Sequence, residues 1–180
     1  DSSTSRGLGD VYKRQSQSTA GSPSGGNPAR WSAHHYRLSG QDVSQLWVAL
    51  RETAEEHLVE LRVALEQMTS QPDTLVSEGR ESLLEKARHG EIVVIDVRPS
   101  SEFNAGHLPF ARSMPLDELE KRLADLPADR TIVAYCRGPF CLMSDEAVQL
   151  LRARGFVARK ISDGVSEWAA SGLPIETSAQ

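Results

Sequence analysis

Cysteine, aromatic residues and long hydrophobic runs are all scarce in this sequence of 180 residues. The two cysteines, Cys136 and Cys141, lie in one short segment, so they cannot form a disulfide framework; in an intracellular protein such a pair points to chemistry or a metal. No apolar stretch has the length needed to cross a bilayer, and residues 1–30 contain no signal-peptide core. We therefore expect a cytoplasmic protein that does not contact a membrane.

Composition and charge restrict the number of domains and the class of partner. With 39% hydrophobic and 25% charged residues, the chain has enough apolar side chains for one ordinary core. The formal net charge is -5, although residues 1–40 carry five Lys or Arg against two Asp. The rest of the chain is therefore acidic, which argues against nucleic-acid binding by its surface.

Residues 1–33 are predicted to form a disordered leader, because Ser, Gly, Gln and Thr are abundant there and apolar periodicity is almost absent. Residues 10–15 (Asp-Val-Tyr-Lys-Arg-Gln) look like the translation of a transposon adapter used to prepare DNA for sequencing. On that interpretation residues 1–15 are an artefact and the true N-terminus is missing. A native polar tail is the alternative.

Residues 41–68 have the spacing of a long amphipathic helix, with apolar side chains every three or four positions. Its apolar face consists of Val43, Trp47, Leu50, Ala54, Leu58, Leu61, Leu65 and Met68. Ser39 and Asp42 are candidates for the N-cap, and Pro72 closes the segment. The helix either forms a homodimer as a coiled coil or packs on its own domain, and the sequence leaves both open.

After Pro72, short apolar runs alternate with helical segments. Residues 92–97 and 131–135 have the continuous apolar character of buried parallel strands, and residues 156–161 form a third candidate. Helices are expected at residues 77–89, 116–124, 142–154 and 165–170. This alternation predicts an α/β domain over residues 72–180, with an open parallel sheet flanked by helices and ligands bound at the carboxyl ends of the strands.

The segment from Cys136 to Cys141 (Cys-Arg-Gly-Pro-Phe-Cys) lies directly between a predicted strand and a predicted helix. The N–H groups of this loop and of the first helical turn point toward whatever Cys136 carries. The helix dipole and Arg137 are expected to lower the pKa of the Cys136 thiol, which makes it a nucleophile. Gly138 permits unusual backbone angles and Pro139 stiffens the turn, so that the anion-binding donors are preorganised.

Other short motifs accompany this loop: Asp96-Val97-Arg98, Glu102-Phe103, Gly106-His107-Leu108-Pro109, Asp163-Gly164 with Trp168, and Gly172-Leu173-Pro174. In this order they resemble the rhodanese family over residues 75–177. The resemblance implies a sulfurtransferase, in which sulfane sulfur passes from a donor such as thiosulfate to Cys136, and from the Cys136 persulfide to a thiol or to cyanide. It places substrate binding on the loop residues Arg137, Gly138, Pro139, Phe140 and Cys141.

One departure from the family concerns the last loop position, where many rhodaneses have a basic residue and this chain has Cys141. The only cation of the loop is Arg137, which puts thiosulfate in doubt as the physiological donor. Cys141 either resolves the Cys136 persulfide, or forms a disulfide with Cys136 under oxidation, or is a small residue packed at the start of the helix.

The residues around the loop allow two kinds of role. Arg98 either helps to bind an anion or pairs with Asp96 to order the end of the strand. His107 is expected to be a hydrogen-bonded support residue, Phe140 a wall of the pocket, and Trp168 part of the core. Two cysteines in one loop with distant histidines make no convincing metal site, so no metal and no other cofactor are expected.

Two further functions are alternatives to sulfur transfer. A rhodanese-related phosphatase or an arsenate reductase needs an arginine six residues after the cysteine, where this chain has Leu142, so oxyanion chemistry is disfavoured. Residues 34–71, which begin His-His-Tyr-Arg-Leu-Ser-Gly, look like the wing remnant and dimerisation helix of an ArsR-type regulator. In that case the domain senses sulfur or oxidant, and DNA is a partner only if a missing N-terminal winged helix is restored.

Overall fold

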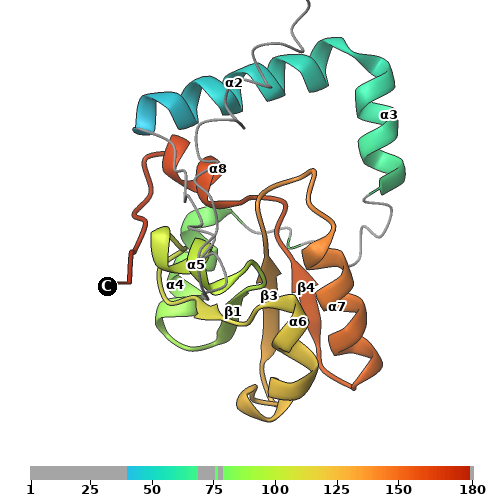
Figure 1. Ribbon diagram of the computed structural model, residues 1–180, viewed down its shortest axis with the longest axis vertical. Helices are drawn as coiled ribbons and strands as arrows, with labels where there is room; N and C mark the ends of the chain where they lie inside the picture. The colour runs from blue at the N-terminus through green and yellow to red at the C-terminus, as the bar shows by residue number, and fades with distance from the viewer. Residues whose placement is uncertain (1–39, 69–75, 77–78, 179–180) are drawn as a thin grey trace, which may run out of the picture. The chain divides into compact units, whose positions relative to one another are not determined.

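Four parallel strands form the central sheet, in the order β2-β1-β3-β4 (Figure 1). They are β1 (Ile92–Asp96), β2 (Arg112–Ser113), β3 (Thr131–Tyr135) and β4 (Ala158–Lys160). The structure is a computed structural model, and it describes residues 40–68, 76 and 79–178. The predicted open parallel sheet is confirmed. Strand β2 is not predictable from the sequence, because a strand of two residues shows no periodicity.

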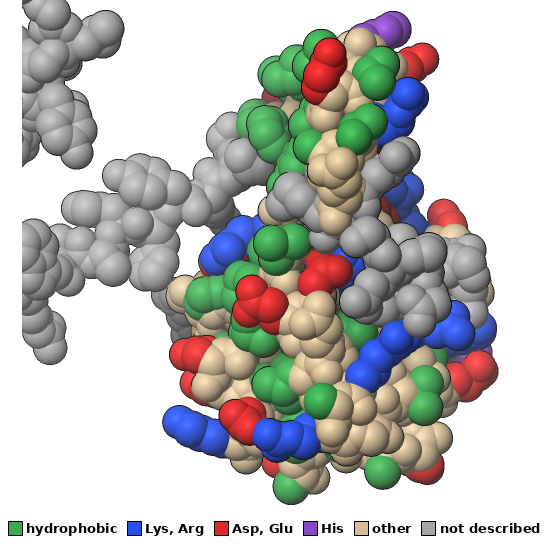
Figure 2. Space-filling view, turned by 90° about the vertical axis from the view of Figure 1, so that its right-hand side faces the viewer, with side chains coloured by type: hydrophobic (Ala, Val, Ile, Leu, Met, Phe, Trp, Pro, Cys, Tyr) green, Lys and Arg blue, Asp and Glu red, His purple; other side chains and the backbone are tan. Residues whose placement is uncertain are grey.

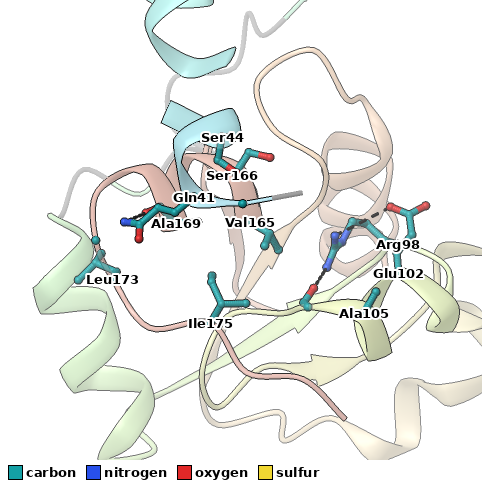
Figure 3. A pocket seen from close by; sticks show the side chains of 13 residues that line it. Gln41, Ser44, Arg98, Glu102, Ala105, Val165, Ser166, Ala169, Leu173 and Ile175 are labelled. Carbon is teal, nitrogen blue, oxygen red and sulfur yellow. Dashed lines mark hydrogen bonds and ion pairs between the residues drawn. The ribbon is translucent and has the colours of Figure 1, made fainter. Parts of the chain in front are cut away.

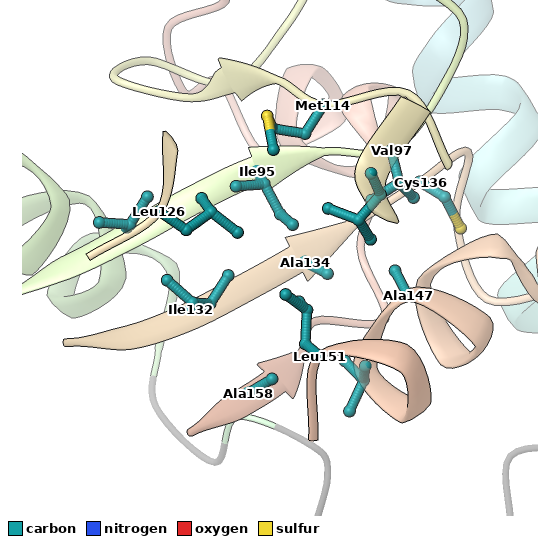
Figure 4. Close-up of a cluster of buried hydrophobic side chains, with 13 residues drawn as sticks. Ile95, Val97, Met114, Leu126, Ile132, Ala134, Cys136, Ala147, Leu151 and Ala158 are labelled. Atoms are coloured by element: carbon teal, nitrogen blue, oxygen red, sulfur yellow. The ribbon is translucent and has the colours of Figure 1, made fainter. Parts of the chain in front are cut away.

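Both faces of the sheet are covered by helices. Successive residues of β1 point to opposite faces, and since nearly all of them are apolar and buried, both faces need a covering layer. One face packs on α6 (Leu116–Leu119) and α7 (Met143–Ala153), and its buried cluster includes Ile95, Ala134 and Leu151 (Figure 4). The other face packs on α4 (Arg80–Arg88) and α8 (Val165–Ala170), where Val94 and Trp168 lie in a second cluster. Trp168 is therefore a core residue, as expected.

The remaining elements follow the predicted order with small shifts at their ends. The segment predicted as a helix over residues 116–124 consists of α6 and a short 3-10 helix, η2 (Glu120–Asp125), and α5 (Ser100–Ala105) precedes β2. The helix predicted over residues 142–154 begins one residue later, as α7. The predicted helix over residues 165–170 coincides with α8.

The long helix predicted over residues 41–68 is wrong as a single helix. The chain forms α2 (Gln41–His57) and α3 (Val59–Met68), which are separated by Leu58 in an extended conformation (φ -106°, ψ 97°). Ser44 and Val48 of α2 are buried, whereas Leu58 and Val59 are more than half exposed. Because burial of α2 ends before Leu58, tertiary packing and not the apolar spacing sets the end of this helix.

Part of the apolar face of this helical pair is exposed. Figure 2 shows hydrophobic side chains gathered on the upper, helical part of the molecule, and the exposed ones on α2, on α3 and between them are Leu46, Trp47, Leu50, Leu58, Val59 and Val63. Another side of α2 packs on α8: Gln41 Nε2 donates to the carbonyl of Ala169 at 3.0 Å. Packing on the same domain, one of the two alternatives for this segment, is therefore observed, and dimerisation stays a prediction.

Several predictions fall outside the described residues. They are the leader at 1–33, the wing segment at 34–39 with the Ser39 cap, the closing Pro72, and the start of a helix at Ser77. The cap observed before α2 is Gly40, and Asp42 lies in its first turn. Among the helices that the structure describes, none combines the length and apolar character required of a membrane span.

Candidate active site in the Cys136 loop

The loop from Cys136 to Cys141 joins the carboxyl end of β3 to α7, where the sequence placed it. Cys136 directly follows Tyr135, the last residue of β3, and is 2% exposed. The turn is closed by the N–H of Cys141, which donates to the carbonyl of Gly138 at 3.1 Å. Gly138 has φ +128°, a backbone conformation that residues other than glycine rarely adopt. The loop thus has a defined fold that depends on this glycine.

Polar groups of the loop and of the first turn of α7 surround the sulfur of Cys136. The Cys136 Sγ lies 3.2 Å from the carbonyl oxygen of Cys141 and 3.4 Å from Ser144 Oγ. Ser144 is buried, and both its hydroxyl and its backbone N–H stabilise a negative sulfur. The N-terminal turn of α7 therefore faces the sulfur, as the position of the loop predicted. Ser144 itself was not among the predicted site residues.

The thiol pKa values differ from the prediction. Burial raises the pKa of Cys136, and the hydrogen bonds from Ser144 offset this only in part. Burial also opposes ionisation of the half-exposed Cys141, but the N–H groups of Arg137 and Met143 and a hydrogen bond from Cys136 outweigh it and lower the pKa of Cys141. The predicted lowering of the pKa at Cys136 is wrong because desolvation exceeds the effect of the helix N-terminus.

The Arg137 side chain interacts with Glu102 and also with Cys141. Its guanidinium forms an ion pair with Glu102 of α5, with Nε 2.9 Å from Oε2, and its Nη1 lies 3.6 Å from Met143 Sδ. The Arg137 side chain is 51% exposed. The only cation of the loop is thus held by a carboxylate in this structure, which makes it a weaker anion ligand than the sequence suggested.

Arg98 orders the end of β1. Its Nε lies 2.9 Å from Oδ1 of Asp96 and its Nη2 lies 2.6 Å from Oδ2, while Nη2 also donates to the carbonyl of Gly106 at 2.7 Å. Arg98 lines a cavity of 510 Å³ together with residues of α2, α5 and α8, and none of the residues 136–141 lines it. Figure 3 shows Arg98 among the other lining side chains. Of the two roles considered for Arg98, the structure shows the structural one.

Tyr135 and His107 complete this support. The Tyr135 hydroxyl donates to Asp96 Oδ2 at 2.6 Å and accepts the N–H of Leu108 at 3.1 Å. Burial, followed by the adjacent Asp96 carboxylate, raises the pKa of Tyr135, so the hydroxyl stays protonated. The His107 Nδ1 lies 2.8 Å from the carbonyl oxygen of Phe103. The imidazole of His107 also stacks on the phenyl ring of Phe103, with the ring centroids 3.7 Å apart. His107 therefore has the predicted support geometry.

A cavity of 310 Å³ opens over the loop, and helix α2 supplies part of its wall. It is lined by Trp47 and Arg51 of α2, by residues 137–141, and by Glu167 of α8. Phe140 is one of these walls, as expected. Trp47, Arg51 and Glu167 were not predicted as site residues; the only sequence signal was Glu167 three residues after Gly164, a spacing typical of a carboxylate that caps a helix.

The described residues also set limits on metal binding. Within residues 40–68, 76 and 79–178, no group of three or more His, Cys, Asp or Glu side chains is placed to hold a metal ion. What the loop offers instead is a buried thiol, a second thiol of lowered pKa, and backbone and hydroxyl donors around the first sulfur. This arrangement is suited to nucleophilic sulfur chemistry.

Comparisons with known proteins agree with this geometry. Residues 80–171 match the family described as rhodanese-like domain. A protein of Allochromatium vinosum named sulfurtransferase is 31% identical over 97 residues, which are 53% of this chain and 89% of that protein. An HTH-type transcriptional regulator of Mycobacterium tuberculosis is 40% identical over 145 residues, 81% of this chain. The chain spans 63% of the length of that regulator.

Solved structures resemble the fold. A full-length protein of Lactobacillus plantarum has a TM-score of 0.53 at 23% identity and covers 64% of this chain and 98% of its own. The BH2092 protein of Bacillus halodurans has a TM-score of 0.51 at 26% identity and covers 54% of this chain and 73% of its own. At 23% identity, the first of these likenesses concerns the fold alone.

Proposed function

Because the chain belongs to the rhodanese-like domain family, we propose that it transfers sulfane sulfur through a persulfide on Cys136. The observation that carries the proposal is the position of the Cys136 sulfur, at the end of β3 and beside the hydroxyl and N–H of Ser144. These donors and the N-terminus of α7 stabilise a terminal sulfur that carries a negative charge.

The first half-reaction forms the persulfide. The Cys136 thiol gives up its proton to solvent base, and the hydroxyl and N–H of Ser144 stabilise the thiolate that remains. The Cys136 thiolate then attacks the sulfane sulfur of thiosulfate; the S–S bond breaks, and sulfite leaves with the electron pair. In the second half-reaction cyanide or a thiolate attacks the outer sulfur, and the Cys136 thiolate leaves.

The choice of donor follows from the two arginines. Arg137 is paired with Glu102 and Arg98 with Asp96, so neither guanidinium is free to bind the two negative charges of thiosulfate. The cavity over the loop is lined by the apolar side chains of Trp47 and Phe140, and its charged lining groups, Arg51, Glu167 and Arg137, are held in ion pairs. We therefore expect thiosulfate to be a poor donor and an organic persulfide to be a better one.

A turnover assay tests the proposal. The protein is incubated with thiosulfate and cyanide, and thiocyanate is measured. Cys136→Ser should abolish the activity, because a hydroxyl cannot hold the sulfur as a persulfide. The matched control is Cys141→Ser, which removes the other thiol of the same loop and should leave turnover measurable. Full activity in Cys136→Ser would refute the proposed mechanism.

A second proposal is that the domain senses sulfur or oxidant within a transcriptional regulator. It is favoured by the likeness to the mycobacterial regulator, which covers 145 residues and so extends well beyond the matched rhodanese-like domain. DNA binding and homodimerisation through residues 41–68 belong to this proposal. Its test is the genomic reading frame upstream of residue 16: an in-frame helix-turn-helix supports the regulator, and a start codon near Trp31 excludes it.

A further inference from the structure

A buried carboxylate packs directly against the Cys136 loop. Glu167 of α8 is 2% exposed and accepts the N–H of Gly164 at 2.8 Å. A Cβ atom placed on Gly138 would lie 3.1 Å from Glu167 Oε2, so the carboxylate touches the loop backbone. The backbone of Gly164 also packs closely against the loop, since a Cβ atom placed on Gly164 would lie 2.8 Å from the backbone N of Gly138. The loop therefore rests on Glu167 and on the turn that precedes it.

The charge of Glu167 is neutralised from outside the sheet domain. Arg51 of α2 places its Nη1 3.1 Å from Glu167 Oε1, and its side chain is 10% exposed. Glu52 and Glu55 on the same helix also lie near Arg51, at 3.7 and 3.4 Å. Arg80 of α4 pairs with Asp163 and affects Glu167 only through the electrostatic field. Arg51 lies outside residues 80–171, the part that matches the family.

The ion pair matters because the loop has to hold a negative sulfur. An unpaired carboxylate behind the loop would repel a thiolate or a persulfide anion on Cys136, and burial of the carboxylate leaves little water to screen this repulsion. Arg51 offsets the charge of Glu167, its nearest carboxylate partner, and it also lines the cavity over the loop. The guanidinium thus connects the charge at the site to the position of α2.

We propose that Arg51 is a positioning residue of the sulfurtransferase site, and that its ion pair with Glu167 couples the docking of α2 to the negative charge on the Cys136 sulfur. The inference rests on the function proposed above and adds a residue outside the family domain. The coupling is reciprocal: if docked α2 favours the anionic sulfur, the anionic sulfur favours docked α2 by the same factor. A segment before the domain can then respond to sulfur loading.

The first test is the rate at which iodoacetamide alkylates Cys136 at pH 7.5. Trypsin cleaves after Arg137, so Cys136 and Cys141 fall on separate peptides, 131–137 and 138–152, and are quantified individually. Arg51→Met should slow alkylation of Cys136 about tenfold, the effect of raising its pKa by about one unit. Arg51→Lys, which restores the charge, should recover most of the rate.

The matched variants separate charge from folding. Glu167→Gln combined with Arg51→Met removes both charges, and the rate should return to within about twofold of wild type. Arg62→Met removes the same charge from exposed α3 and should have no effect. A rate unchanged by Arg51→Met, or a double variant as slow as the single one, would overturn the role of Arg51.

The second test measures the coupling by hydrogen exchange of residues 41–57 in the thiol and persulfide forms. Protection of α2 should increase on persulfidation in wild type and stay constant in the double variant; equal protection of both wild-type forms would refute the coupling. Alkylation needs no sulfur transfer, so the two proposals fail separately. A wild type that never accepts sulfur refutes the sulfurtransferase, whereas normal sulfur loading with an unaffected Arg51→Met refutes the role of Arg51 alone.

Discussion

Replacement of Tyr135 by Phe removes a single oxygen from the support beneath the active-site loop. That oxygen donates to Asp96 at 2.6 Å and accepts the N–H of Leu108 at 3.1 Å. Asp96 and Tyr135 are completely buried, and Asp96 keeps its ion pair with Arg98 in the variant. The substitution therefore isolates two buried hydrogen bonds without breaking the salt bridge or leaving a large cavity.

The expected loss follows from these two bonds. A hydrogen bond to a charged group contributes about 1.5–3 kcal/mol, and a buried N–H left without a partner costs about 1–3 kcal/mol. Because the two effects share one oxygen they do not add fully, and we expect Tyr135→Phe to lower the free energy of unfolding by about 3 kcal/mol. With a urea m-value of about 2 kcal/mol/M, the midpoint shifts by about 1.5 M.

Urea unfolding followed by tryptophan fluorescence measures this shift, since Trp168 lies in the same buried cluster as Tyr135. The matched control is Thr53→Ala, which removes an exposed hydroxyl bonded to the carbonyl of Ala49 at 2.8 Å. The control should change stability by less than about 0.5 kcal/mol. A Tyr135→Phe variant within that same limit would refute the reasoning about the buried network.

Three other predictions concern the loop. At pH 7 iodoacetamide should modify Cys141 faster than Cys136, because the lowered pKa of Cys141 leaves more thiolate at neutral pH and the raised pKa of Cys136 leaves less. The difference in rate should shrink as the pH rises above both pKa values, and faster modification of Cys136 at pH 7 would contradict the prediction. Gly164→Ala should slow sulfur loading at least about tenfold, which corresponds to about 1.4 kcal/mol of activation free energy. The φ of -110° at Gly164 suits any residue, but the new Cβ would lie 2.5 Å from the carbonyl carbon of Arg137, so the loop has to shift; unchanged loading kinetics would exclude this contact. Glu102→Gln should lower the KM for thiosulfate in steady-state kinetics, because it frees Arg137 from its ion pair, and it should change the free energy of unfolding in urea by less than about 1 kcal/mol. An unchanged KM would mean that Arg137 does not contact the donor.

The sheet and the location of the loop were predictable because their signals are local. The runs at residues 92–97 and 131–135 are apolar at nearly every position, as strands covered on both faces require, and Cys136 follows the second run directly. Gly138 adopts the left-handed angles that its place in the turn suggested. In each case neighbours in the sequence determine the conformation.

The features that escaped prediction depend on contacts between distant residues. Arg51 and Glu167 are 116 positions apart, and no periodicity in either segment predicts that they meet. The end of α2 at His57 likewise follows from packing on α8 and not from apolar spacing, which continues past Leu58. The raised pKa of Cys136 is not predictable for the same reason, because its burial depends on the packing of the whole domain.

The most direct test of sulfur transfer through Cys136 is to locate the added sulfur. Thiosulfate or an organic persulfide is mixed with the protein, thiols and persulfides are alkylated in denaturant, and peptides 131–137 and 138–152 are analysed by mass spectrometry after trypsin cleavage. We predict one added sulfur atom on the peptide that contains Cys136, and its loss on addition of cyanide. Sulfur found only on the peptide that contains Cys141, or on neither peptide, would contradict the proposed mechanism.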